Sequence, residues 1–163
     1  MAVAYLLLGG NQGETQNTFI RTIELIKLRI GAIKTQSSIY KTAAWGNTNQ
    51  PDFLNQVIEV NTLLHPNHLL NQILSIELEL GRKRDILWGQ RIIDIDILFY
   101  DALIYDSIEL TIPHKYLHTR MFALIPLHEI APQLVHPILQ KNIKALIEAC
   151  DDKLAVTKIS KTD

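Results

Sequence analysis

The stretch Gly81–Tyr100, GRKRDILWGQRIIDIDILFY, is the part of the chain that decides how the rest is interpreted. Its second half alternates, which places Asp94 and Asp96 on one face of a predicted strand and the neighbouring isoleucines on the other. Aspartate is a poor strand former, and two carboxylates at this spacing lie roughly 7 Å apart and repel each other. A hard cation such as Mg²⁺ relieves that repulsion and brings phosphates with it. The alternation therefore predicts a magnesium–nucleotide site on a strand.

Positive charge precedes this strand, in Arg82, Lys83, Arg84 and Arg91. A polyphosphate needs such groups, and the sequence Trp88-Gly89-x-Arg91 makes the pattern more specific than Asp-x-Asp alone. The plainer alternative is a solvated strand face whose aspartates pair with the arginines in surface salt bridges of about 0–1 kcal/mol each.

The composition is that of an ordinary globular protein, with 163 residues, 47% apolar and 20% charged. We expect one domain over residues 1–163. A net charge of −1 provides no global field for a nucleic acid or a membrane surface, so we expect neither as a partner. The single Cys150 fits a reducing compartment, and Met1 runs into a short apolar strand without a basic leader. We therefore expect a cytoplasmic monomer.

The apolar periodicity predicts the order β-α-β-β-α-β followed by a helical and irregular tail. This order is typical of the ferredoxin-like split β-α-β fold, an α+β class with an antiparallel sheet and helices on one face. The other face would stay open for a ligand and would carry both aspartates. The strands before the aspartates are expected over residues 3–8, 34–42 and 52–64, the helices over 15–29 and 65–81, and the tail elements over 123–130, 141–149 and 154–159.

The glycine-rich segment 9–13, GGNQG, follows the first predicted strand. It matches neither the dinucleotide-binding fingerprint nor the Walker phosphate loop. A simple tight turn is the expected role.

Further motifs extend almost from end to end of the chain and occur in one order. They are Gly9-x-Asn11, Thr42-x-x-Trp45-Gly46, Gln50-Pro51-Asp52-Phe53-Leu54-Asn55, Glu77, Gly81-Arg82, Trp88-Gly89-x-Arg91, Asp94-x-Asp96, Pro113-His114, Arg120-x-Phe122 and Pro126-Leu127-x-Glu129-Ile130-Ala131-Pro132. In these residues the chain resembles the 6-hydroxymethyl-7,8-dihydropterin pyrophosphokinases of the folate pathway. That family transfers a pyrophosphoryl group from ATP to the hydroxymethyl oxygen of the pterin and leaves AMP.

The resemblance implies ATP and 6-hydroxymethyl-7,8-dihydropterin as substrates and two Mg²⁺ ions with the ATP. Asp94 and Asp96 would hold the metals, and Arg82 and Arg91 would stabilise charge on the transferred phosphates, so these four are the expected catalytic residues. By resemblance, Arg91 would also bind ATP. The other positions that the resemblance places near ATP are Glu77, Arg84, Trp88, Ile97, Thr111, His114 and Arg120.

A pterin is flat and aromatic, so its site needs stacking surfaces and a few aimed polar groups. By resemblance, Phe53 and Phe122 would sandwich the ring, and Asp94 would lie near its hydroxymethyl oxygen. The remaining positions that the resemblance places around the pterin are Thr42, Ala43, Ala44, Trp45 and Asn55.

Some residues depart from the family pattern. Gln90 stands where many relatives carry proline, Phe53 where tyrosine is common, and Trp45 where a smaller apolar residue is frequent. Two other functions stay open from the residues alone. Split β-α-β sheets also bind RNA, although the two aspartates would repel its phosphates. Asp-x-Asp strands also serve nucleotidyltransferases.

Overall fold

The computed structural model describes residues 1–44, 49–82 and 91–159. Within them, the main sheet has the strand order β5-β1-β4-β3-β8, and β2 also pairs with β4. The elements of the first half are β1 (Ala2–Gly10), α1 (Thr15–Arg29), β2 (Gly31–Gln36), β3 (Tyr40–Thr42), β4 (Phe53–Thr62) and α2 (Pro66–Glu79). Those of the second half are β5 (Asp94–Tyr100), β6 (Tyr105–Asp106), β7 (Thr111–Ile112), the 3₁₀ helix Leu117–Thr119, α3 (Met121–Ile130), α4 (Ile143–Ala149) and β8 (Thr157–Lys158).

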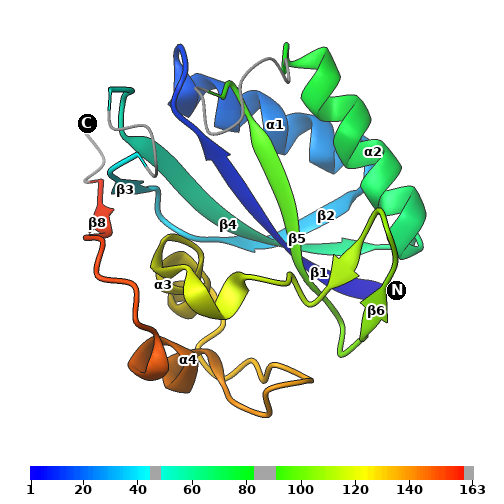
Figure 1. Ribbon diagram of the computed structural model, residues 1–163. Helices are drawn as coiled ribbons and strands as arrows, with labels where there is room; N and C mark the ends of the chain where they lie inside the picture. Colours follow the sequence, from blue (N-terminus) through cyan, green and yellow to red (C-terminus); the bar gives the residue numbers. More distant parts are fainter. Residues whose placement is uncertain (45–48, 83–90, 160–163) are drawn as a thin grey trace.

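The α+β class and the antiparallel sheet predicted from the sequence are confirmed. β1 is the central strand and runs antiparallel to both β4 and β5. Helices α1 and α2 cover one face of the sheet (Figure 1). Their buried residues Phe19 and Ile73 pack with Leu6, Ile58 and Ile95 in a continuous apolar core. The isoleucines of β5 thus face the helices, as the alternation predicts.

The opposite face is only partly open, which corrects the expectation of a free face. Helices α3 and α4 lie on it (Figure 1), and Leu124 and Leu146 pack against Val57, Leu98 and Phe99 there. Leu98 and Phe99 share this face because the pairing of β5 with β1 shifts register between Tyr5 and Leu6, which interrupts the alternation. Two consecutive apolar side chains on one face require a cover, and the C-terminal extension provides it.

The predicted strand 34–42 is two strands, β2 and β3. Ser37 lies between them, and its hydroxyl accepts a hydrogen bond of 3.0 Å from Val57 N. The side chain of Gln56 donates to the carbonyl of Ser37 at 2.8 Å. These bonds replace regular strand pairing at the break. Because of this break, β3 is a separate short strand, and its last residue, Thr42, lines a cavity on the sheet.

In the part of the chain that the structure describes, no helix combines the length and the apolar character needed to cross a membrane.

Candidate active site

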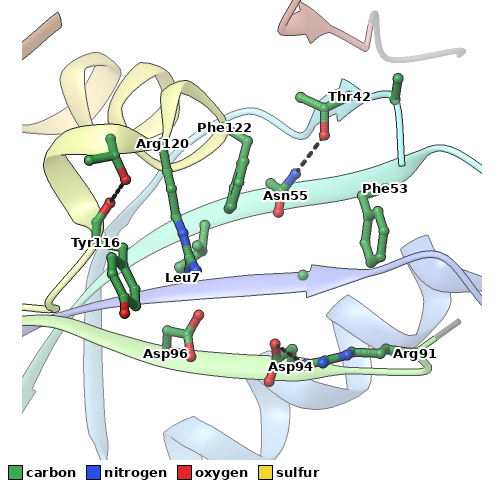
Figure 2. Close-up of a pocket in the computed structure, with 13 residues that line it drawn as sticks. Leu7, Thr42, Phe53, Asn55, Arg91, Asp94, Asp96, Tyr116, Arg120 and Phe122 are labelled. Atoms are coloured by element: carbon green, nitrogen blue, oxygen red, sulfur yellow. Dashed lines mark hydrogen bonds and ion pairs between the residues drawn. The ribbon is translucent and has the colours of Figure 1, made fainter. Parts of the chain in front are cut away.

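A cavity of about 520 Å³ opens on the sheet face that α3 and α4 leave uncovered (Figure 2). Its walls come from β1, β3, β4, β5, the segment that leads into α3 and the first turn of α3. The residues predicted from the sequence that line it are Thr42, Ala43, Phe53, Asn55, Arg91, Asp94, Asp96, Arg120 and Phe122. The lining residues that the sequence did not predict are Leu7, Gly9, Tyr116 and Thr119.

The acidic part of the cavity is built on β5, where Asp94 is held by two arginines. Its Oδ1 accepts a hydrogen bond of 2.8 Å from Arg82, and its Oδ2 accepts one of 2.9 Å from Arg91. The guanidinium of Arg82 also donates to Glu77, whose side chain is buried. Glu77 in turn accepts from Ile95 N at 3.1 Å. Arg82 therefore ties α2 to the first aspartate of the motif.

Asp96 has a different environment. Among the described residues its recorded ion-pair partner is His114, whose Nε2 lies 4.0 Å from Asp96 Oδ2. Burial, and then the charge of Asp94, raise the pKa of Asp96 to about 7. Burial, and then the charge of Arg120, lower the pKa of His114 to about 4, so its imidazole is neutral at pH 7. Because the histidine is neutral, the charges of Arg120 and Arg82 are what oppose the increase in the pKa of Asp96.

Glu77 adds to this negative charge. Burial raises its pKa to about 7 against the lowering effect of Arg82, and the charge of Asp94 contributes to the increase. Two carboxyl groups, Asp94 and Asp96, thus line one end of the cavity, and the buried Glu77 lies behind them through Arg82; Asp94 is the one that pairs with two guanidinium groups.

This donor set fits Mg²⁺ that arrives with a nucleotide. Asp94 and Asp96 both line the cavity, whereas no cluster of three or more His, Cys, Asp or Glu side chains suited to a metal occurs among the described residues. Magnesium commonly binds one or two carboxylates, with waters and substrate phosphates completing its shell. The residues therefore suit a metal shared with a polyphosphate better than a metal held by protein groups alone.

The other part of the cavity is an aromatic slot. Figure 2 shows Phe53 and Phe122 on two sides of it, with Asn55 between them. Asn55 is buried and donates a long hydrogen bond of 3.4 Å to Thr42 Oγ1. A Cβ at Gly9 would lie 3.2 Å from Asn55 Oδ1, so the glycine leaves room for this amide. A slot with two rings and a buried amide suits a flat heterocycle with polar edges.

A basic group bridges the two parts. The guanidinium carbon of Arg120 lies 5.3 Å from the ring centre of Tyr116 and 5.6 Å from that of Phe122. Both distances are within the range of cation–π attraction. Figure 2 shows Arg120 between these two rings, with Asp96 below it. Arg120 is thus held at a position where its guanidinium group could bind an anionic group beside the slot.

The segment predicted to be a simple tight turn has a second role that the prediction missed. Asn11 is buried, and its side-chain amide donates to Gln50 Oε1 and Pro51 O, both at 2.9 Å. Its Oδ1 accepts from Arg91 N at 2.9 Å, and its own backbone N–H donates to Arg91 O at 2.9 Å. A Cβ at Gly10 would lie 2.6 Å from Ile92 O, so only glycine allows this approach. Asn11 therefore fixes the backbone of Arg91 and the segment leading to Phe53.

Other predicted positions do not meet the cavity through their side chains. Ile97 is 4% exposed and lies in the helix-side core. Thr111 donates its hydroxyl to Asp106 at 2.9 Å, and Ala44 is buried outside the lining. The predictions for Trp45, Arg84 and Trp88 fall outside the described residues.

Leu7 and Gly9 were missed although a signal existed. They pair with Asp96 and Asp94 across β1 and β5, so knowledge of the strand order would have placed them in the site. Tyr116 precedes a 3₁₀ turn that the sequence pattern does not mark.

Fold and site together define a class of protein: an enzyme with a carboxylate pair and guanidinium groups for a polyphosphate beside a slot for a flat ring. The family model for 7,8-dihydro-6-hydroxymethylpterin-pyrophosphokinase (HPPK) matches residues 5–132. The chain belongs to this family, and the resemblance seen in the sequence is confirmed.

Two relatives show how far the similarity extends. The 2-amino-4-hydroxy-6-hydroxymethyldihydropteridine pyrophosphokinase of Aquifex aeolicus is 41% identical over 144 residues, which cover 88% of this chain and 89% of the relative. The enzyme of the same name from Haemophilus influenzae is 37% identical over 155 residues, with coverages of 94% and 97%.

A solved structure shares the fold. The crystal structure of Plasmodium falciparum HPPK-DHPS wild type with pteroate superposes with a TM-score of 0.76 at 19% identity. The match covers 91% of this chain and 42% of that longer one.

Proposed function

We propose that this chain transfers a pyrophosphoryl group from ATP to the hydroxymethyl oxygen of 6-hydroxymethyl-7,8-dihydropterin, giving AMP and the pterin diphosphate in folate biosynthesis. The observation that carries the proposal is that a carboxylate pair, two arginines and an aromatic slot line one cavity. Family membership over residues 5–132 supports the same reaction. The reaction requires a site for a phosphoryl donor beside a site for a flat acceptor, and the charged part and the slot would provide these two sites.

The charged part of the cavity has the groups that the transfer needs. The hydroxymethyl oxygen forms a bond to the β-phosphorus of ATP, the bond from that phosphorus to the oxygen of AMP breaks, and the hydroxyl proton is released. Asp94 and Asp96 would hold two Mg²⁺ ions, which stabilise the attacking and leaving oxygens of such a displacement. Arg91 and Arg82, which pair with Asp94, would also stabilise charge on the transferred phosphates.

The slot would orient the acceptor. Phe53 and Phe122 would stack on the pterin, and Asn55 and the backbone near Thr42 would bond its edge. Stacking fixes the plane of the ring, and the edge bonds fix its rotation within that plane. Together they would hold the hydroxymethyl group toward Asp94, which converts binding energy into orientation.

We further propose that residues 1–163 act as one pyrophosphokinase domain, as a monomer in the cytoplasm. Sedimentation at micromolar concentration tests the monomer, because a dimer would nearly double the measured mass.

The adenine product of ATP consumption is the decisive measurement. A single-turnover reaction with ATP, Mg²⁺ and 6-hydroxymethyl-7,8-dihydropterin should release AMP only when the pterin is present. Release of ADP would reject the proposal, and a product that contains the nucleoside monophosphate would favour a nucleotidyltransferase. Tight, salt-sensitive RNA binding without turnover would favour a binding module.

A further inference from the structure

A polar cluster behind the slot is not explained by the transfer reaction. It joins the end of α3 to the edge of the sheet and contains Glu129, Ser38, Tyr40 and Lys158. We call it the Glu129 clasp. Glu129 Oε2 accepts from Ser38 N and from the Tyr40 hydroxyl, both at 2.9 Å, and Oε1 accepts from the Ser38 hydroxyl at 2.7 Å. Lys158 Nζ lies 3.6 Å from Oε1.

The two elements that the clasp joins carry opposite walls of the slot. Helix α3 contains Phe122 in its first turn and Glu129 in its last. Strand β3 contains Tyr40 and, two residues further, Thr42, which lines the cavity and pairs with Phe53 of β4. A movement of α3 relative to β3 would therefore change the shape of the slot directly.

Strand β3 pairs with β4 through all three of its residues, so what the clasp can set is how α3 lies against that pair. Strand β3 has three residues and pairs on its outer side with only Thr157 and Lys158 of β8, within the described part of the chain. The face of α3 against the sheet is apolar, through Ala123, Leu124 and Leu127. Apolar contact is non-directional, so it specifies the position of the helix along the sheet less sharply than directional bonds do. Directional bonds at the end of the helix can fix it.

The charge states suit a permanent clasp. Burial, and then the bond to Glu129, raise the pKa of the Tyr40 hydroxyl to about 12, so it remains a donor at neutral pH. Burial works to raise the pKa of Glu129, but the bonds from Ser38 and Tyr40 outweigh it and lower that pKa. An ionised carboxylate that accepts three short bonds is among the stronger polar tethers in proteins.

We propose that Glu129 is a positioning residue for the pterin, which acts by tying α3 to β3 and so setting the distance between Phe122 and the Thr42–Phe53 wall of the slot. The proposal rests on the proposed function for the identity of the ligand. Glu129 does not line the cavity, and its effect passes through the two elements that it joins. It should therefore change pterin binding more than ATP binding, because Asp94 and Asp96 lie on β5, at the other edge of the sheet.

The test compares Glu129→Gln and Tyr40→Phe with Glu79→Gln as a matched control. Glu79 also joins two elements, through bonds of 2.9 and 2.8 Å to Arg29, but it does so between α1 and α2 on the opposite face. Steady-state kinetics should show the pterin KM raised about fivefold or more by Glu129→Gln and about twofold by Tyr40→Phe. The ATP KM should stay within about twofold in both, and Glu79→Gln should change neither.

A second measurement does not depend on turnover. Hydrogen exchange of the amides of residues 40–42 should become faster in Glu129→Gln and stay unchanged in Glu79→Gln. Unchanged exchange there, or equal changes in both KM values, would overturn the clasp as a positioning device. If the wild type is active, an unchanged pterin KM in Glu129→Gln would overturn the positioning role of Glu129 and leave the proposed function intact. Failure of the wild type to form AMP would instead refute the proposed function.

Discussion

The charged part of the cavity and the aromatic slot are assembled in opposite ways. Arg91, Asp94 and Asp96 come from one strand and the turn just before it. Phe53, Thr42 and Phe122, in contrast, come from β4, β3 and α3, which are brought together only by the fold. The carboxylate pair and Arg91 are thus local in sequence, whereas the slot depends on long-range packing.

The two parts also differ in how well their polar groups are stabilised by other protein groups. In the charged part, burial raises the pKa values of Asp96 and Glu77 to about 7, so their negative charges are unfavourable where they stand. In the slot, the buried side chains of Asn55 and Thr42 bond each other. The difference teaches that the charged part holds carboxyl groups whose ionisation burial opposes, while the polar groups of the slot already bond each other.

The largest expected effect comes from removing the buried negative charge of Asp96. Asp96→Asn should lower kcat at least about 1000-fold, because it removes a carboxylate that we propose holds a metal. It should also raise the Tm of the ligand-free protein at pH 8 by roughly 3 °C. The folded-state pKa of about 7 lies above the ordinary value of 3.8, so the carboxylate destabilises the fold increasingly as pH rises between these values. Thermal unfolding at pH 8 and pH 4 checks this.

The Tm advantage of Asp96→Asn should therefore shrink as pH falls from 7 toward 4. Asp151→Asn, at an exposed aspartate, is the control and should change neither kcat nor Tm. If Asp96→Asn had a lower Tm than the wild type at pH 8, the ionised Asp96 would not destabilise the fold.

Arg82 should show the next largest effect, because it neutralises two carboxylates at once. Arg82→Met should reduce kcat about 100-fold by removing a cation from the proposed phosphate site. It should also lower the free energy of unfolding by about 3 kcal/mol, since Glu77 is left buried without its partner. Urea unfolding and AMP formation are the two measurements.

The double variant Arg82→Met with Glu77→Gln separates these two roles. Removing the buried charge should restore most of the stability but none of the kcat. Recovery of kcat together with stability would show that Arg82 serves the fold alone.

This contrast also explains how much the sequence could predict. Asp94 and Asp96 were predictable because alternation along one strand fixes which face they share. The fold class was predictable from the order of apolar segments. Asn11 was not, because its bonds reach residues 39, 40 and 80 positions away.

Long-range packing accounts for the other differences. The cover over Leu98 and Phe99 depends on a register shift that no local pattern marks. Ile97 was expected near ATP by resemblance, yet alternation itself sends its side chain into the helix-side core. Resemblance found the slot residues because their motifs are specific, whereas periodicity alone would have assigned Phe53 and Phe122 to a core.

The slot predicts a smaller and more selective effect. Phe53→Ala should raise the pterin KM about tenfold through loss of one stacking surface, and it should leave the ATP KM within about twofold. The guanidinium group of Arg120 lies over the ring of Phe122, so Phe53 is the better of the two slot rings for testing stacking separately from that cation. Isothermal titration with the pterin, and separately with a non-hydrolysable ATP analogue, gives the two affinities. An equal loss for both ligands would show that the two parts of the cavity do not act separately.

The smallest effect is expected from Phe53→Tyr, which keeps the ring and adds a hydroxyl group. Phe53 is half-buried at the rim of the slot, so an added hydroxyl can extend toward solvent without entering the core. The stacking surface is unchanged, and we expect pterin KM and kcat within about twofold of wild type. The same steady-state assay that measures Phe53→Ala checks it. A tenfold change in either direction would mean that the hydroxyl meets a polar partner in the slot, and the slot would then select its ligand by more than ring stacking.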